Sequence, residues 1–194
     1  MRLWALAVLM SCTVLAVPIT YSANGTFAAG TATTAFSAPN QTWSFSFVID
    51  SNPGVSDVSV GNAFDPAFSN FTYTLNGSSV PIVPANLRFF SALQSGMFNI
   101  CFISTCTGIA NPTNGFGFFG PQVYSGSESA PTMLTGDFTS ATSGGGLPGF
   151  RLWAGGTGVA QPNVTVSGVA APEPSTMSLG AGLMAIAAAR LRRR

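Results

Sequence analysis

The chain has 194 residues, enough for one ordinary domain, and only 7% of them are charged, well below the roughly one quarter that is usual. It holds no lysine and no histidine, and four of its seven arginines lie in the last five residues. The stretch between the two ends is mildly acidic, which argues against a nucleic-acid-binding protein, because such a protein needs a basic stripe to neutralise phosphates.

The N-terminal residues have the pattern of an export signal. Arg2 is a minimal basic region, residues 3–17 are an apolar run too short to span a membrane comfortably, and Pro18 ends the run. We therefore predict an exported protein with a cleaved signal peptide. Two alternatives stay open at this point, a retained N-terminal anchor and lipoprotein processing at Cys12.

The signal peptide is expected to end among the small residues that follow the apolar run. Cleavage after Ser22, with Thr20 at the −3 position, and cleavage after Ala23 both fit this pattern. Residues 1–23 are therefore the predicted signal peptide.

The central region, residues 24–168, is predicted to be β-structure. Residues 42–50 alternate apolar and polar side chains, which is typical of a half-buried strand. Its apolar face would hold Trp43, Phe45, Phe47 and Ile49. Residues 71–75 alternate in the same way, and Asn76-Gly77 is the strongest short hairpin signal, so the chain is expected to turn there and run back through residues 80–83.

Further short strands and glycine- or proline-rich turns fill the rest of this region. The strands are predicted at residues 55–60, 87–91, 97–103, 115–119, 150–154 and 164–167. Residues 139–149 are polar and glycine-rich, which indicates an exposed loop. We predict an all-β domain, a two-sheet sandwich of jelly-roll or immunoglobulin-like type.

Two cysteines, Cys101 and Cys106, remain once a signal peptide is removed. In an oxidising compartment an even pair at close spacing is most simply a disulfide. A zinc site is rejected, because zinc takes four ligands and the chain has no histidine and no further cysteine beyond the signal.

Residues 115–120 fit the glycine pattern of a dinucleotide-binding loop, and Asp137 lies about twenty residues further on, where such a fold carries an acid. The context does not fit, because Pro121 follows at once and the intervening phenylalanines would crowd a pyrophosphate. We predict an aromatic strand here, and no cofactor.

Asp50, Asn52 and Asp57 carry oxygen ligands at short spacing, which suits calcium. The same residues are also typical of an ordinary β-turn. We predict no metal site, and a calcium-stabilised module stays an alternative.

The residues that acid–base catalysis most often uses are missing. With histidine and lysine absent, only a pair of carboxylates remains, as in glycosidases, and nothing in the sequence singles out a pair. We predict a non-catalytic protein. The alternative is a carbohydrate-binding or glycan-cleaving surface domain, which exposure of Trp43, Trp153 or Tyr124 would favour and burial of all three would disfavour.

The last residues follow a three-part order. A Pro-Glu-Pro-Ser motif comes first, an apolar segment at residues 177–189 follows, and arginines close the chain. The motif consists of Pro172, Glu173, Pro174 and Ser175, and the arginines are Arg190, Arg192, Arg193 and Arg194. When it is extended to residues 175–191, the apolar segment reaches the lower limit of a membrane-spanning helix. The positive-inside rule places the arginines in the cytoplasm.

This tail resembles the PEP-CTERM sorting signal of exported bacterial proteins. The resemblance covers residues 172–194 and implies recognition by exosortase, a membrane-embedded protease-transpeptidase that is thought to cut near the Pro-Glu-Pro. It implies an inner-membrane intermediate with its domain in the periplasm, then delivery to the cell surface or the extracellular matrix, with exopolysaccharide as a further partner. Residues 169–194 are accordingly the predicted sorting segment.

Overall fold

The computed structural model describes residues 16–31, 33–59, 63–94, 96–102, 114–141, 149–154, 157–161 and 164–172. Within these ranges the regular structure is β, apart from one short 3-10 turn at Ala92–Gln94. The strands are β1 (Pro18–Thr26), β2 (Thr42–Asp50), β3 (Val55–Ser59), β4 (Ala63–Pro66), β5 (Ser69–Leu75), β6 (Ser78–Ser79), β7 (Asn86–Phe90), β8 (Phe98–Cys101), β9 (Asn114–Phe118), β10 (Tyr124–Ser127), β11 (Ala130–Met133), β12 (Gly136–Thr139), β13 (Phe150–Ala154), β14 (Thr157–Gln161) and β15 (Thr165–Ala170).

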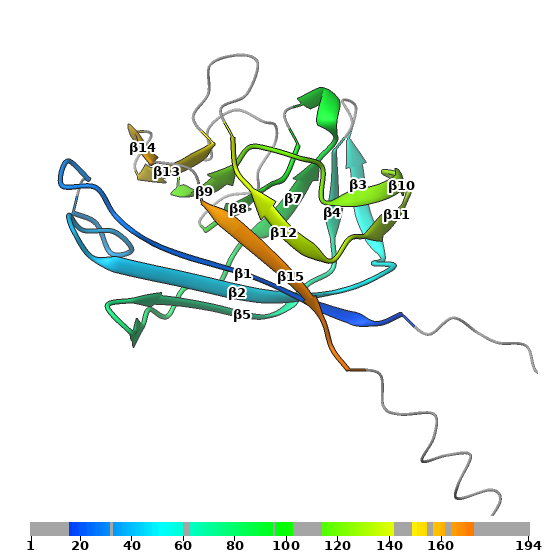
Figure 1. The fold of residues 1–194 in the computed structure, drawn as a ribbon, viewed down its shortest axis with the longest axis horizontal. Coiled ribbons are helices and arrows are strands. Elements are labelled where there is room, and N and C mark those ends of the chain that lie inside the picture. The colour runs from blue at the N-terminus through cyan, green and yellow to red at the C-terminus, as the bar shows by residue number, and fades with distance from the viewer. Residues whose placement is uncertain are drawn as a thin grey trace, which may run out of the picture.

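Two antiparallel sheets form a β-sandwich (Figure 1), which confirms the predicted all-β class. In the described part of the chain, the first sheet has the order β12-β15-β1-β2-β5-β6, and the second has the order β14-β13-β9-β8-β7-β4-β3. The hairpin β10-β11 forms a separate two-stranded sheet and is tied to the turn after β2, where the Met133 amide donates to the Ser51 carbonyl over 2.7 Å.

Aromatic side chains from both sheets fill the space between them. The ring of Trp43 in β2 lies 4.9 Å from Phe150 in β13, and Phe47 in β2 lies 5.4 Å from Phe98 in β8. Tyr73 in β5 contacts the second sheet in the same way. Such ring pairs add about 0.5–1.5 kcal/mol each beyond the area that they bury. The alternation predicted for residues 42–50 is confirmed, because Trp43, Phe45, Phe47 and Ile49 are all buried.

The hairpin at Asn76-Gly77 is also confirmed, and both residues have the positive φ that this turn requires. Its return strand is shorter than expected, because β6 ends at Ser79 and residues 80–83 form no strand. Proline is the physical reason, since Pro81 has no N–H to donate to a ladder.

The strand β1 lies in the middle of the first sheet, between β15 and β2. It begins at Pro18, within the residues that the sequence assigns to a signal peptide. Its pairing with β2 covers nine register positions, from Pro18 opposite Asp50 to Thr26 opposite Thr42.

Candidate functional site

The two ends of the described chain lie side by side at one end of the first sheet (Figure 1). Ile19 near the start of β1 pairs with Ala170 at the end of β15, and the Ala171 amide donates to the Pro18 carbonyl over 2.7 Å. Pro172, the first residue of the predicted sorting motif, is exposed and lies two residues beyond the last strand. The segments that the sequence assigns to the two ends would therefore leave the sandwich from the same place.

The rest of the predicted tail, Glu173, Pro174, Ser175 and the arginines Arg190, Arg192, Arg193 and Arg194, lies outside the described residues. Among the helices of the described residues, none has the length and apolar character to cross a membrane.

One half of the predicted disulfide is described. Cys101 closes β8 and is fully buried, opposite Asn86 in β7 and Gly115 in β9. Cys106 lies outside the described residues, so the pairing of these two cysteines stays a prediction.

The outer face of the first sheet carries rows of hydroxyl groups, which we call the hydroxyl face. One row crosses β12, β15, β1, β2 and β5 at matched register positions, and it consists of Asp137, Ser167, Ser22, Ser46 and Thr72. Neighbouring side chains in the row bond to each other, with 2.7 Å from Ser167 Oγ to Asp137 Oδ1 and 2.8 Å between the hydroxyls of Ser46 and Thr72.

A second pair of hydroxyls, Ser44 and Thr74, lies 2.7 Å apart on the same face, two residues further along the strands. Asp137 is the one charged side chain among these residues, and it is exposed. The hydroxyl face is thus a half-exposed, nearly uncharged surface that offers hydrogen-bond donors and acceptors.

A polar row also crosses the second sheet, on the face turned away from the first. Arg88 in β7 pairs with Asn99 in β8, Asn99 pairs with Gly117 in β9, and Gly117 pairs with Arg151 in β13. On the other side of Arg88, the pairing of β4 with β7 brings Asp65 alongside it. The row thus contains Arg88 and Arg151, the two arginines that lie outside the terminal segments.

Arg88 and Asp65 form a buried ion pair. The Arg88 Nε atom lies 3.2 Å from Asp65 Oδ1, and the two side chains are 3% and 15% exposed. The Asn86 amide donates to the other Asp65 oxygen over 3.0 Å. Both carboxylate oxygens of Asp65 are therefore engaged within the polar row, one by Arg88 and the other by Asn86.

Asn99 lies in the middle of this row and is fully buried. Neither its amide nitrogen nor its amide oxygen has a hydrogen-bond partner. A buried amide without partners costs about 1–3 kcal/mol, and a bound water is the usual way to satisfy it.

The aromatic side chains proposed for sugar stacking are largely inside the protein. Trp43 and Tyr124 are each 2% exposed, and the side chain of Trp153 lies outside what the structure describes. Tyr124 donates to Glu128 Oε1 over 3.0 Å. Burial raises the pKa of Tyr124, and the hydrogen bond and charge of Glu128 raise it further. For Trp43 and Tyr124 the structure therefore favours a packing role.

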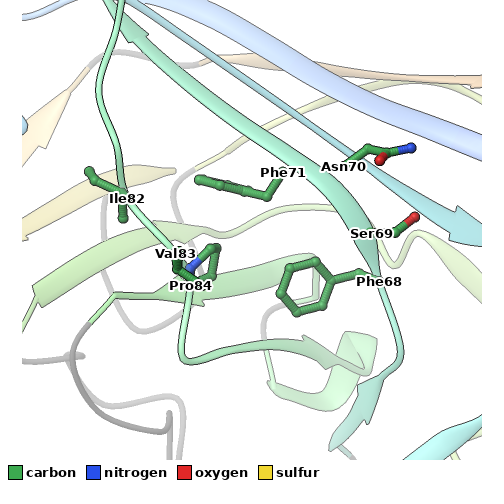
Figure 2. A pocket seen from close by; sticks show the side chains of 7 residues that line it. All are labelled: Phe68, Ser69, Asn70, Phe71, Ile82, Val83 and Pro84. Carbon is green, nitrogen blue, oxygen red and sulfur yellow. The ribbon is translucent and has the colours of Figure 1, made fainter.

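A shallow hollow of about 430 Å³ lies between the start of β5 and the segment before β7 (Figure 2). Its lining comprises Phe68, Ser69, Asn70, Phe71, Ile82, Val83 and Pro84. Figure 2 shows the rings of Phe68 and Phe71 on the side of Ile82 and Pro84, while the polar ends of Ser69 and Asn70 turn away. A sugar site needs polar groups that converge on the ligand, and this hollow lacks them.

The structure describes part of the remaining candidate sites from the sequence. Asn52 Oδ1 accepts from Thr132 Oγ1 over 3.2 Å, and Asp57 lies within β3. No group of three metal-ligating side chains occurs among the residues that the structure describes. The glycine pattern at 115–120 falls largely on β9, whose Phe116 and Phe118 are buried, so the predicted aromatic strand is confirmed.

Sequence reasoning missed both the hydroxyl face and the Asp65–Arg88 pair. The alternation of Ser44 and Ser46 with aromatic residues did signal an outward polar face on β2. The neighbouring rows become visible only with the strand order, because the residues involved come from five strands spread over most of the chain. Comparisons of the chain with models of known protein families, with curated proteins and with solved structures each found no match.

Proposed function

We propose that this protein is an exported, non-catalytic β-sandwich that carries a C-terminal sorting tag for exosortase and serves as a component of the cell surface or extracellular matrix. The observation that carries the proposal is the order of parts in the tail: Pro-Glu-Pro-Ser at residues 172–175, an apolar segment at 177–189 and a terminal cluster of arginines. This order resembles the PEP-CTERM signal.

The geometry around Pro172 supports this proposal. A protease binds an extended chain, and the two prolines that flank Glu173 disfavour helix there. Because β15 ends at Ala170 and Pro172 is exposed, the motif begins just outside the folded domain, where an enzyme can reach it.

The adjacent ends of the sandwich fit the same pathway. A precursor with an apolar segment at each terminus would be held at the inner membrane by both, with its domain in the periplasm. Such a double attachment is easy when the ends of the domain lie side by side, as Pro18 and Ala171 do. Cleavage at both ends would then release the domain toward the surface.

The intact mass of the protein, measured in each cell fraction of its native host, tests this proposal. With exosortase present, we expect the exported protein to lack the apolar tail, with a new C-terminus near Glu173. Without exosortase, we expect the tail to remain through Arg194. A tail that stays intact in both strains would contradict the proposal. The variant Glu173→Gln tests the motif, and Glu128→Gln is its matched control outside the tail.

A second candidate, glycan binding, is favoured by one observation, the hydroxyl face. Neutral polysaccharides present many hydroxyl groups, and a nearly uncharged face of serine and threonine can exchange hydrogen bonds with them. Affinity electrophoresis in a gel that contains the exopolysaccharide of the host tests this. A glycan-binding role is supported if the polysaccharide retards the protein, if Thr72→Val weakens the retardation, and if the control Ser56→Ala on β3 leaves it unchanged. Equal mobility with and without polysaccharide would oppose this role.

Within the sandwich class, we propose a jelly-roll or immunoglobulin-like type as the finer description. The antiparallel pairing throughout both sheets supports that choice.

A further inference from the structure

The strand β1 is an integral part of the sandwich and not an appendage. It is the strand that joins β15 to β2 in the first sheet. All four of its register pairs with β15 involve the residues from Ile19 to Ser22. Without these residues, β15 and its neighbour β12 would have no partner in the rest of the sheet.

Two of these four residues, Ile19 and Tyr21, also belong to the core. Ile19 and Tyr21 are 2% and 0% exposed. The Tyr21 ring stacks on Phe47 with its centroid 5.6 Å away, and its hydroxyl donates to the Leu134 carbonyl. Tyr21 therefore ties β1 to the neighbouring strand β2 and to the turn before β12.

Cleavage after Ser22 or Ala23 would remove this part of the fold. It would take away Ile19 and Tyr21, leave the Leu134 carbonyl without its donor, and reduce β1 to its last three or four residues. A domain processed there would lose a central strand, so the cut that yields a folded protein must lie earlier in the chain.

The residues just before β1 offer such a cut. Val14 and Ala16 occupy the −3 and −1 positions of a bond that fits the small-residue rule for signal cleavage, and they lie near the end of the apolar run of residues 3–17. Ala16 is exposed. Of the residues that the structure describes, Val17 is the first with a hydrogen bond to the fold: its N–H donates to Ser51 Oγ over 3.0 Å, and its carbonyl accepts from the Ser51 amide.

We infer that the signal peptide ends at Ala16 and that the mature chain begins with Val17, so that β1 is kept whole. The inference rests on the proposed export of the protein. In this step, a signal peptidase adds water across the Ala16–Val17 amide. Ala16 leaves with the new carboxylate, and Val17 keeps the new amino group. As an ammonium, that group can still donate to Ser51 Oγ.

The test is the first residue of the full chain after production in its native host, read by mass spectrometry of the N-terminal peptide from the exported fractions. Val17 as the first residue supports the inference. A start at Ala23, at Asn24 or at Cys12 overturns it and leaves export intact. Retention of Met1 in every fraction contradicts both this inference and the proposed signal peptide.

Two variants sharpen the test. Ala16→Gln places a large polar side chain at the −1 position, so we expect most molecules to keep Met1. Ser22→Gln makes the same kind of change at the −1 position of the cleavage site predicted after Ser22, and we expect the processed variant still to begin with Val17. Blocked processing in Ser22→Gln with normal processing in Ala16→Gln would overturn the inference.

Discussion

Tyr21, Tyr73 and Tyr124 are the three tyrosines of the chain, and all of them are buried. Two hydroxyls bond to backbone carbonyls, Tyr21 to Leu134 and Tyr73 to Phe36 over 2.6 Å, and the third bonds to Glu128. Burial is the largest cause that raises the pKa of each tyrosine above its usual range. Neutral phenol groups are therefore part of the folded state.

This burial predicts a loss of stability at alkaline pH. Above about pH 10, the unfolded chain releases tyrosine protons that the folded protein still holds, so the free energy of unfolding falls as pH rises. Urea denaturation should give a lower midpoint at about pH 10.5 than at about pH 9. The variant Tyr73→Phe should lose less between these two pH values than the parent protein, and an equal loss in both would contradict the explanation.

Removing one member of the Asp65–Arg88 ion pair is expected to lower the stability of the protein strongly. Arg88→Met removes the cation beside the Asp65 carboxylate, which is 15% exposed in the parent protein. We expect a loss of about 3–5 kcal/mol in the free energy of unfolding. Adding Asp65→Leu to that variant should restore much of the loss, because both charges are then gone. Asp50→Asn, at an exposed carboxylate, should change stability by no more than about 0.5 kcal/mol. Urea denaturation of the four proteins measures this, and a double variant no more stable than Arg88→Met would contradict the explanation.

At the scale of the strands, sequence patterns predicted some elements well and missed others. The alternation of β2 and the Asn76-Gly77 turn are local signals, and both were found. The strand at Phe150–Ala154 was predicted with its observed bounds. The strand β1 was missed, because its first residues adjoin an apolar run and its small residues look like a cleavage region.

The polar row on the second sheet could not be predicted from the sequence either. Asp65, Arg88, Asn99 and Arg151 come from four strands, and their alignment depends on the order β13-β9-β8-β7-β4. No local pattern encodes that order. The sorting motif was easier to recognise, because all its parts are consecutive in the chain.

The close contact of β15 with β1 predicts a steric effect at Gly168. A Cβ atom there would come within 2.8 Å of the Tyr21 ring, so Gly168→Ala should force the ring to shift. We expect a loss of roughly 1–3 kcal/mol in the free energy of unfolding. Gly54→Ala is the matched control, because a Cβ atom there meets nothing within 4 Å. Equal urea midpoints for the two variants would show that the sheet absorbs the extra methyl group.

At the scale of the whole molecule, processing is expected to reverse the sign of the net charge. The precursor has a net charge of +1, but Arg2 and four further arginines lie in the two terminal segments together with Glu173. The remaining domain holds two arginines and five carboxylates, which gives a net charge of −3. Isoelectric focusing should therefore place the processed protein at a clearly more acidic point than the precursor, whose sequence pI is about 7.7. An unchanged or more basic position would mean that the arginine cluster is retained.

The neighbouring ends of β1 and β15 also determine how the domain responds to mechanical force. The two strands are antiparallel, and the chain enters β1 where it leaves β15. A pull on both termini would load the hydrogen bonds between these strands one after another, as in unzipping. A domain attached at both ends would therefore open under low tension. If the two terminal segments are cut off as proposed, no tether remains at these two ends, and the domain is no longer loaded in this weak direction.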